Sequence, residues 1–501
     1  MSESGGSALT YVLAVDVGTS RCKVALVDPH GKVLAKTLEG YEVLRPDSIC
    51  AEQSPLVWWK AFKKGVSELL RISKVDPRKI AAVGISGQSP VVFPIDSKGN
   101  PLNNALLWMD RRALPQAKRL ARIFGVREDP SNALAKILWF KDEKPWVFNE
   151  TFKFLQTSDY IAFKLTGKFV TDKFTAMTAF FKLSDWSWAS EIEDLGVPID
   201  KFPDVLEPGS PIGPILGQVS REVGLGEDTV VVAGSIDAYL AILGSGAIRS
   251  GSACDITGTS TCLMITSSKA IYDPKERIFC TPHFFKDLFI VSGVLSTTGA
   301  SISWFLEEFG KEEILKASKT GEDPFDLLIS RASGVQPGSE GLIFLPYLAG
   351  ERSPIWDPFA KGAIIGLTLK HGKNHIIRAI LEGCAFGLRH IIETAEELGV
   401  HIDEIRVCGG ASKSDLFCQI KANVVGKPVI TLQDPDASLV GAAILALVGG
   451  GIYKEIKSAV KNVVKIGSIF TPEEGFKGKY DEIFGLYKQS YNVLREILHK
   501  L

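Results

Sequence analysis

The chain has 501 residues, of which 45% are hydrophobic and 23% charged, and its formal net charge at pH 7 is −1. This length exceeds what one hydrophobic core usually organises and predicts two domains, which we expect over residues 1–250 and 251–501. Because the chain lacks the basic excess that binding to a nucleic-acid backbone requires, nucleic acid is not expected as a partner.

The first ten residues contain neither the basic nor the apolar segment of a signal peptide, and no apolar run reaches the ~18 residues of a membrane span. The eight cysteines lack the spacing of metal-binding knuckles, and most lie within apolar runs, so we expect reduced thiols in the core. These features predict a cytoplasmic protein without a membrane partner.

The first elements predict a mixed α/β fold. Residues 11–17 and 23–28 are apolar runs on either side of a Gly-Thr-Ser turn, and a third run covers 33–40, which indicates strands joined by turns. Residues 54–72 place apolar side chains at helical spacing behind Ser-Pro, and 80–88 is again typical of a strand.

The second half repeats this theme. Asp255 precedes a second Gly-Thr-Ser turn, as Asp16 precedes the first, and helices are predicted over 375–399 and from 414 to 426. The repeat indicates corresponding hairpins in two similar halves, although so short a motif also recurs by chance.

A Gly-Thr-Ser turn between strands presents backbone N–H groups and hydroxyls that can hold phosphate oxygens. Asp16 beside the first turn is a candidate ligand for Mg²⁺, which favours one or two carboxylates plus phosphate oxygens. The alternative is an ordinary hairpin with a hydrogen-bonded aspartate. Neither turn has the spacing of a P-loop.

Asp237 follows an apolar run and opens an apolar helical stretch. It either caps the helix or acts as a general base toward an attacking hydroxyl, and the two roles are compatible. The histidines compete poorly for this role: His371 and His375 lie four apart without the HExxH pattern, so a solvated helix entrance is expected there.

Two segments carry a family resemblance that runs nearly end to end: the chain resembles the FGGY carbohydrate kinases, most closely their xylulokinase branch. Residues 131–143 fit the first family signature except at Ala133, where the family usually has Pro, Ser or Thr. The matching positions of residues 131–143 are Lys136, Ile137, Trp139, Phe140, Asp142 and Glu143. Residues 362–382 fit the second signature through Gly362, Ile364, Gly366, Leu367, His375, Ile376, Ala379, Ile380, Leu381 and Glu382.

The resemblance implies two ribonuclease-H-like domains of the actin and hexokinase type, with mixed sheets flanked by helices and a nucleotide cleft between them. It implies an ATP-dependent, Mg²⁺-assisted transfer to a small sugar or polyol, with Asp237 as the catalytic base and Asp16 near the metal. The implied ATP-binding residues are Asp16, Gly18, Thr19, Ser20, Arg21, Gly258, Thr259, Gly299, Ser303, Gly409, Gly410, Ala411 and Ser414.

The sugar-binding residues depart from the xylulokinase pattern. That branch has Met and His where this chain has Ser89 and Pro90, and proline has neither an N–H nor a ring nitrogen to bind a hydroxyl. The remaining candidates combine polar groups with an aromatic face. The full candidate set for the sugar is Gln88, Ser89, Trp108, Asp110, Arg111 and Asp237. For Asp110 and Arg111 a structural ion pair is an alternative.

The expected acceptor is a pentulose such as xylulose, with ribulose, gluconate, glycerol or another polyol as alternatives. An actin-like switch ATPase without a sugar acceptor is the second class of function, since the shared fold alone does not decide function. A homodimer is one open alternative for the oligomeric state.

Overall fold

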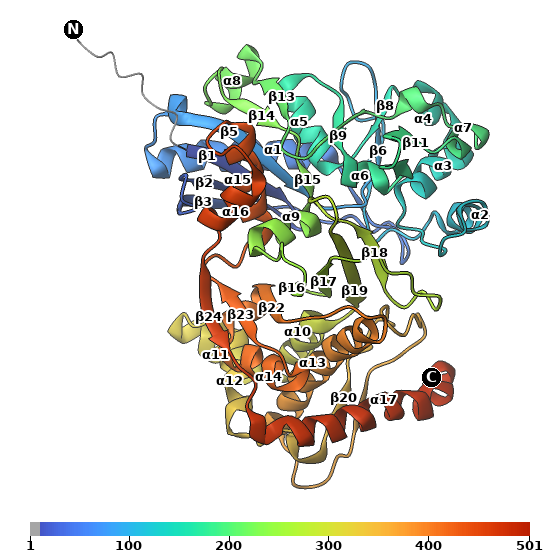
Figure 1. Cartoon of the computed structure of the whole chain (residues 1–501), viewed down its shortest axis with the longest axis vertical. Coiled ribbons are helices and arrows are strands. Elements are labelled where there is room, and N and C mark those ends of the chain that lie inside the picture. Colours follow the sequence, from blue (N-terminus) through green and yellow to red (C-terminus); the bar gives the residue numbers. More distant parts are fainter. Residues whose placement is uncertain (1–10) are drawn as a thin grey trace. The chain divides into compact units, whose positions relative to one another are not determined.

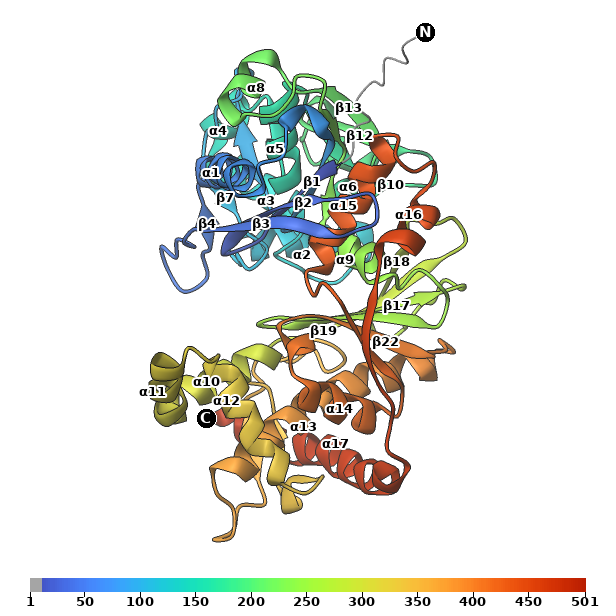
Figure 2. The same ribbon diagram turned by 90° about the vertical axis from the view of Figure 1, so that its left-hand side faces the viewer.

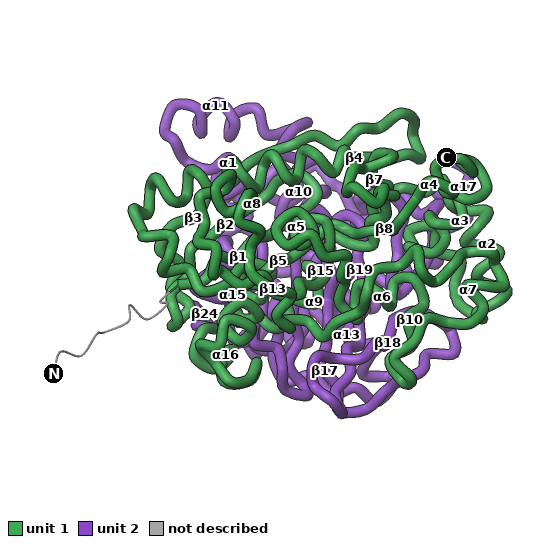
Figure 3. Tube along the Cα trace, turned by 90° about the horizontal axis from the view of Figure 1, so that it is seen from above, with its two compact units in different colours: residues 1–244, 438–464 green, residues 245–437, 465–501 purple. Residues whose placement is uncertain are grey.

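The computed structural model describes residues 11–501, so the N-terminal segment without signal-peptide features lies outside the described residues. The chain divides into two compact units. Unit 1 runs to Gly244 and includes residues 438–464, whereas unit 2 comprises 245–437 and 465–501 (Figure 3). The first division lies between residues 244 and 245, and a late segment returns to the first unit, which the predicted ranges do not contain.

Unit 1 is built on a mixed sheet in the order β13-β14-β5-β1-β2-β3. Its strands are β1 (Tyr11–Val17), β2 (Arg21–Val27), β3 (Val33–Gly40), β5 (Ile80–Gly87), β13 (Pro211–Pro214), β14 (Val230–Val232) and, paired with the end of β5, β15 (Ser235–Ile236). β1 pairs antiparallel with β2 and parallel with β5, so it is central and buried on both faces. This position explains why β1 is a nearly continuous apolar run.

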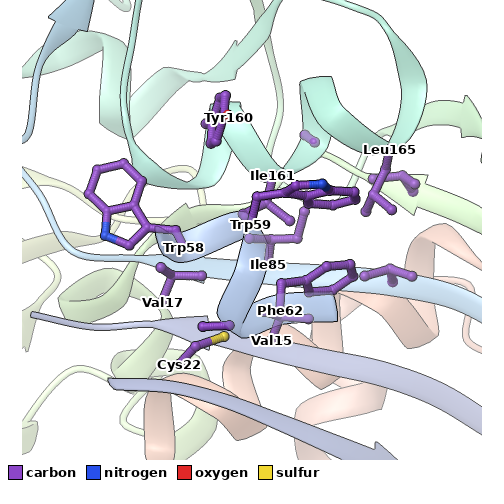
Figure 4. Packing of buried hydrophobic residues seen from close by; sticks show 14 of the residues in the cluster. Val15, Val17, Cys22, Trp58, Trp59, Phe62, Ile85, Tyr160, Ile161 and Leu165 are labelled. Carbon is purple, nitrogen blue, oxygen red and sulfur yellow. The ribbon is translucent and has the colours of Figure 1, made fainter. Parts of the chain in front are cut away.

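One face of this sheet is covered by α1 (Pro55–Ser73) and α5 (Thr157–Thr166) (Figures 1 and 2). Proline occupies the first turn of α1, where its missing N–H costs nothing, and Lys74 ends the helix in a left-handed conformation. Trp58, Trp59 and Phe62 from α1 enter the core shown in Figure 4. The helical spacing predicted over 54–72 is thus confirmed.

The segment that returns to unit 1 is mainly α15 (Ala437–Gly449), which is apolar around its whole circumference. Such a helix must be buried. Two glycines allow its close backbone approach to the rest of unit 1. A Cβ on Gly84 of β5 would lie 2.0 Å from the carbonyl oxygen of Ala442, so α15 lies against the sheet there, and a Cβ on Gly441 would lie 2.0 Å from the carbonyl oxygen of Leu240, which belongs to the helix over Asp237–Ser245. A long-range glycine contact of this kind has no local sequence signal.

The other elements of unit 1 form small two-stranded ribbons and helices. The strands are β4 (Glu52–Gln53), β6 (Phe93–Ile95), β7 (Ala105–Leu106), β8 (Lys153–Leu155), β9 (Val170–Asp172), β10 (Phe181–Lys182), β11 (Ser187–Trp188) and β12 (Asp204–Leu206). The helices are α2 (Leu114–Phe124), α3 (Ala133–Glu143), α4 (Pro145–Glu150), α6 (Lys173–Met177), α7 (Glu191–Asp194), α8 (Gly217–Val223), α9 (Asp237–Ser245) and α16 (Ile456–Val463).

Unit 2 repeats the sheet of unit 1. The path β24-β23-β22-β16-β17-β19 has the same order and the same parallel and antiparallel pairings as β13-β14-β5-β1-β2-β3. Its strands are β16 (Ser252–Thr257), β17 (Thr261–Ser267), β18 (Phe279–Pro282), β19 (Phe289–Leu295), β22 (Glu404–Gly409), β23 (Val429–Leu432) and β24 (Ile466–Phe470). The two Gly-Thr-Ser turns therefore occupy equivalent hairpins, β1–β2 and β16–β17.

The helices α13 (Lys373–Glu397), α14 (Asp415–Val425) and α17 (Lys477–Lys500) lie on one side of the unit 2 sheet (Figure 2). Within α13, the Glu382 carboxylate accepts hydrogen bonds from Arg378 at 2.8 Å, from the Tyr480 hydroxyl at 2.8 Å and from the Gly338 N–H at 2.9 Å. Glu382, a matching position of the second signature, is thus the acceptor of a buried hydrogen-bond network. The further elements of unit 2 are α10 (Thr298–Phe309), α11 (Lys311–Thr320), α12 (Pro324–Ser330), β20 (Ile343–Leu345) and β21 (Ala363–Ile365).

Within residues 11–501, none of the helices combines the length and apolarity needed to cross a bilayer. The eight cysteines are thiols and not disulfides, and six of them are buried, as the sequence predicts. His371 and His375 lie at the start of α13, where the Nδ1 of His375 accepts a hydrogen bond from the Gly372 N–H at 3.1 Å. The predicted helix entrance is confirmed.

Candidate active site

The first candidate phosphate turn joins β1 to β2 in unit 1. The Gly18 N–H donates to the Arg21 carbonyl at 3.1 Å, and the Gly18 carbonyl accepts from the Tyr41 hydroxyl at 2.7 Å. Thr19 is half-buried, whereas Ser20 and Arg21 are exposed. The turn is therefore held at its base while its hydroxyl and guanidinium groups remain accessible.

Asp16 lies on β1 next to this turn and is only 6% exposed. Its direct neighbours on the two adjacent strands are its partners: Ser86 on β5 donates to Oδ1 at 2.8 Å, and the Nζ of Lys23 on β2 lies 3.7 Å from Oδ2. The sheet register thus places one hydroxyl and one cation beside this carboxylate.

Asp237 begins α9, directly after β15, whose residue Ser235 is paired with Ser86. Its Oδ1 accepts the N–H of Ala238 at 2.7 Å, which agrees with the helix-start alternative. Burial and the negative charge of Asp16 raise the pKa of Asp237 to about 7, against the lowering effects of the Ala238 N–H and the Lys23 charge. A carboxyl group with this pKa can exchange a proton near neutral pH.

The candidate sugar-binding residues of unit 1 differ in their hydrogen-bond partners. Trp108 donates its indole N–H to the Thr19 hydroxyl at 3.1 Å, which links it to the first phosphate turn. Gln88 is 1% exposed and its Oε1 has no hydrogen-bond partner within the described residues. The Ser89 hydroxyl donates to the Gln156 side chain at 2.8 Å, so its proton is already used.

Asp110 and Arg111 do not form the ion pair considered from the sequence. The fully buried Asp110 carboxylate accepts the Ala51 N–H at 2.7 Å and pairs with Arg112 at 2.9 Å, while Arg111 is 43% exposed on its side chain and lies 3.9 Å from Asp129. The partner of Asp110 is instead Arg112, the residue that follows Arg111 in the chain. Arg112 also lies 2.7 Å from Glu52. These contacts give Asp110 a structural role.

Gln53 is a residue that the sequence analysis missed. It is 1% exposed; its Oε1 accepts from Trp58 and from Gln88 at 3.0 Å each, and its Nε2 donates to the Thr19 carbonyl at 2.6 Å. This side chain therefore connects the phosphate turn to the Gln88 segment. Its only sequence signal is a polar residue immediately before the Ser-Pro start of a helix.

The second candidate phosphate turn joins β16 to β17 in unit 2. The Gly299 N–H donates to the Gly258 carbonyl at 3.1 Å, and the Ala300 N–H to the Thr259 carbonyl at 3.0 Å, so the start of α10 is attached to the turn. A Cβ on Gly299 would lie 2.2 Å from the Gly258 oxygen, which only glycine avoids. Ser303 follows on α10 and is half-buried.

The second turn also has a buried ion pair that the sequence analysis did not identify. Lys421 on α14 lies 2.6 Å from Asp255 and donates to the Thr257 hydroxyl at 3.0 Å. The side chains of Lys421 and Asp255 are 2% or less exposed. The Lys23–Asp16 contact of the first turn is both longer and more exposed. The two similar turns thus differ in how their aspartates are neutralised, and Asp16 is the more available of the two.

The candidate adenosine segment follows β22. Gly409 has φ 77° and ψ −159°, a region essentially restricted to glycine, and a Cβ there would lie 2.6 Å from the Thr257 carbonyl oxygen. Gly410 is exposed, and a Cβ added to it would meet no atom within 4 Å. Ala411 is half-buried, and the Ser414 hydroxyl caps α14 by accepting the Phe417 N–H at 3.3 Å.

Within the described part of the chain, no group of three or more His, Cys, Asp or Glu side chains is arranged to hold a metal ion by itself. The candidate donor of unit 1 is instead the Asp16 carboxylate, beside a turn suited to phosphate. A single carboxylate fits Mg²⁺, which takes few protein ligands and completes its shell with phosphate oxygens and water.

Known proteins are similar to this chain over nearly its whole length. Models of the N-terminal and C-terminal domains of the FGGY family of carbohydrate kinases match residues 11–244 and 255–450. Xylulose kinase of Bacillus subtilis (strain 168) is 30% identical over 98% of each chain, and gluconokinase of the same organism is 29% identical over 95% of each. The ligand-bound crystal structure of xylulose kinase from Lactobacillus acidophilus superimposes with a TM-score of 0.86 at 29% identity, covering 97% of this chain and 98% of that one.

Proposed function

Because the chain belongs to the FGGY family of carbohydrate kinases and is an ATP-dependent sugar kinase, we propose that it phosphorylates a hydroxyl of a pentulose such as xylulose. Asp237 is the proposed general base. The observation that carries this role is the Asp237 carboxyl group at the start of α9, next to Asp16, with a pKa of about 7. Ribulose, gluconate, glycerol and other polyols are the alternative acceptors.

In the proposed step, the acceptor hydroxyl transfers its proton to the Asp237 carboxylate as its oxygen attacks the γ-phosphorus of ATP. The bond between the γ-phosphorus and the bridging oxygen breaks, and ADP leaves. Positioning and electrostatic stabilisation supply most of the rate in such transfers. The accessible Arg21 guanidinium and the N–H groups of the first turn are suited to stabilise the charge on the transferring group.

We assign Mg²⁺ to Asp16, with Asp237 nearby. When bound, the ion would supply positive charge to the phosphate oxygens. The Ser86 hydroxyl supports this assignment because it fixes the orientation of the Asp16 carboxylate without neutralising its charge.

We assign the phosphates of ATP to Gly18, Thr19, Ser20 and Arg21 in unit 1 and to Gly258 and Thr259 in unit 2. The nucleoside is assigned to Gly299, Ser303, Gly409, Gly410, Ala411 and Ser414. The support is the close backbone packing at Gly299 and Gly409, which holds both segments directly against the second phosphate turn.

Gln88 and Trp108 are the proposed sugar contacts with the strongest support. The Oε1 of Gln88 is a buried acceptor without a partner within residues 11–501, and a sugar hydroxyl would satisfy it. Trp108 offers an aromatic face beside Thr19. Ser89 contributes at most the lone pairs of its hydroxyl, and Asp110 and Arg111 are the weakest members of the predicted set. A cytoplasmic location belongs to the same proposal.

A panel of acceptors tests the proposed substrate class. ADP release is followed with ATP and Mg²⁺ in the presence of D-xylulose, D- or L-ribulose, gluconate, glycerol or erythritol. We expect one pentulose to raise the rate at least about tenfold over the acceptor-free rate, because a matched acceptor supplies the nucleophile in a positioned form. ATP hydrolysis that no acceptor accelerates would instead favour the switch ATPase.

The pH dependence tests the proposed base. Asp237 must be ionised, so kcat/KM for the acceptor should fall as pH drops through about 7 and be about tenfold lower at pH 6 than at pH 8. Lys23→Met removes a charge that lowers the Asp237 pKa, so this acidic limb should move to higher pH. Lys64→Met, which removes an exposed partner of Glu39, is the matched control and should leave the limb unchanged. A limb that Lys23→Met leaves in place would contradict the assignment.

A further inference from the structure

Lys136 is a lysine in the interior of unit 1, on α3, and its side chain is completely buried. Its Nζ donates to two backbone carbonyls, that of Pro90 at 2.7 Å and that of Leu107 at 2.8 Å. Neither carbonyl belongs to α3: one lies in the segment after β5, and the other in the segment after β7. A single side-chain nitrogen therefore joins two different loop segments of unit 1.

Both carbonyls adjoin a candidate sugar contact. Pro90 directly follows Ser89 and Gln88, and Leu107 directly precedes Trp108. The first segment is held a second time by Gln156, whose Oε1 accepts the Ser89 hydroxyl at 2.8 Å and the Val91 N–H at 3.2 Å. The second segment is held by Asp110 through the Ala51 N–H. The two segments are thus individually anchored and are paired by backbone hydrogen bonds between Val92 and Leu106 at 2.9 and 3.1 Å. Lys136 adds a side-chain connection on the other side of this bridge, next to Ser89 and Trp108.

The burial of Lys136 requires a physical explanation. Transfer of a charged group from water to the protein interior costs free energy, and an aliphatic side chain would fill the same space. Burial lowers the pKa of Lys136 to about 7. A neutral amine still carries two N–H groups, which equals the number of carbonyls it contacts. The connection therefore persists in either protonation state, and geometry is the property that this residue provides.

We propose that Lys136 is a positioning residue for the acceptor: by binding the Pro90 and Leu107 carbonyls together, it sets the separation between the Gln88–Ser89 segment and Trp108, and thereby determines sugar affinity. This inference rests on the proposed sugar contacts of unit 1. Neither carbonyl adjoins a residue assigned to the nucleotide, and Trp108 reaches the phosphate turn through its indole hydrogen bond to Thr19, so the larger effect is expected on the acceptor and the smaller one on ATP.

The test compares Lys136→Met with Lys141→Met. Methionine keeps the length and apolar volume of lysine but has no donor. Lys141 lies on the same helix and also donates to a carbonyl, that of Leu195 at 2.6 Å, away from both segments. For Lys136→Met we expect the acceptor KM to rise about tenfold or more, since small displacements of positioned groups are expensive, while the ATP KM changes less than about twofold. Lys141→Met should leave both constants within about twofold.

The split between the two KM values separates positioning from a general loss of stability. If Lys136→Met raised both KM values equally, or left the acceptor KM unchanged, the inference would be overturned. If this variant does not accumulate as folded protein, Lys136→Gln replaces it. The amide keeps two N–H donors for the buried carbonyls, but its side chain is one bond shorter than that of lysine, so the two segments must shift to reach it. In Lys136→Gln the acceptor KM should therefore rise, though by less than in Gln88→Ala, which removes a proposed sugar contact completely; a wild-type acceptor KM contradicts the inference.

Amide hydrogen exchange without any ligand gives a readout that does not depend on the proposed function. In Lys136→Met, or in Lys136→Gln, residues 88–92 and 105–110 should exchange faster together, whereas Lys141→Met should change neither segment. Unchanged exchange in both segments would overturn the positioning role. A wild-type protein that phosphorylates no sugar would instead contradict the proposed function, so the two failures are distinguishable.

Discussion

Replacing Asp237 with asparagine should lower kcat by about a hundredfold or more, because the variant loses its general base. The substitution also tests the helix-start alternative. Asparagine keeps the side-chain oxygen that accepts the Ala238 N–H and is as good a residue as aspartate at a helix start. If Asp237 served only the helix, the variant would turn over like the wild type. Steady-state kinetics with the best acceptor of the panel decides between the two roles, and the ATP KM should change little.

The same variant should be more stable than the wild type at alkaline pH. Burial raises the folded-state pKa of Asp237 above its unfolded value, so its contribution to stability is present at low pH and is lost as pH rises through about 7. Asparagine has no charge to bury. We expect its Tm to exceed that of the wild type by about 2–4 °C at pH 8, or about 1 kcal/mol, and the difference to shrink at pH 5. A lower Tm at pH 8 would show that the ionised carboxylate is well stabilised.

Gly409→Ala should have the second large effect, on nucleotide binding. Alanine is strained at φ 77° and ψ −159°, at a cost of about 1–3 kcal/mol, and its Cβ would lie 2.6 Å from the Thr257 carbonyl oxygen. The segment must move, and Thr257 immediately precedes the second phosphate turn. We expect the ATP KM to rise about tenfold or more and unit 2 to lose stability, while the acceptor KM stays near the wild-type value.

Gly410→Ala is the matched control for this prediction. A methyl group at Gly410 meets no atom of the described chain within 4 Å, so the fold should keep its wild-type Tm. Any rise in the ATP KM of Gly410→Ala would then come from steric conflict between the added methyl group and the bound nucleotide. An effect of Gly409→Ala on the acceptor KM alone would contradict the assignment of this segment to the nucleotide.

Local patterns predicted most of the elements that form the site. The apolar run before Asp16, the turn at Gly18 and the helix behind Ser-Pro all appear where their spacing indicates, and so does the helix that begins at Asp237. These features depend on neighbours in sequence, which propensity and periodicity report directly. The equivalence of the two Gly-Thr-Ser hairpins, uncertain from so short a motif, is confirmed by the matching strand order of the two sheets.

Contacts between distant segments could not be predicted in the same way. Lys421 pairs with Asp255 across 166 positions, and Lys136 reaches Pro90 across 46, with no local signal in either case. The pairing of Asp110 with Arg112 in place of Arg111 depends on which way a short loop turns its side chains. The return of residues 438–464 to unit 1 depends on glycines that admit α15 against the sheet. Such features require the fold before they can be identified.

The most direct measurement of the central claim is ³¹P NMR of the wild-type protein with ATP, Mg²⁺ and D-xylulose, run beside Asp237→Asn. A sugar kinase with Asp237 as its base should convert ATP into ADP and a new phosphomonoester in equal amounts, and the variant should form this product about a hundredfold more slowly. Formation of inorganic phosphate in place of the ester, or equal product formation by the variant, would contradict the account.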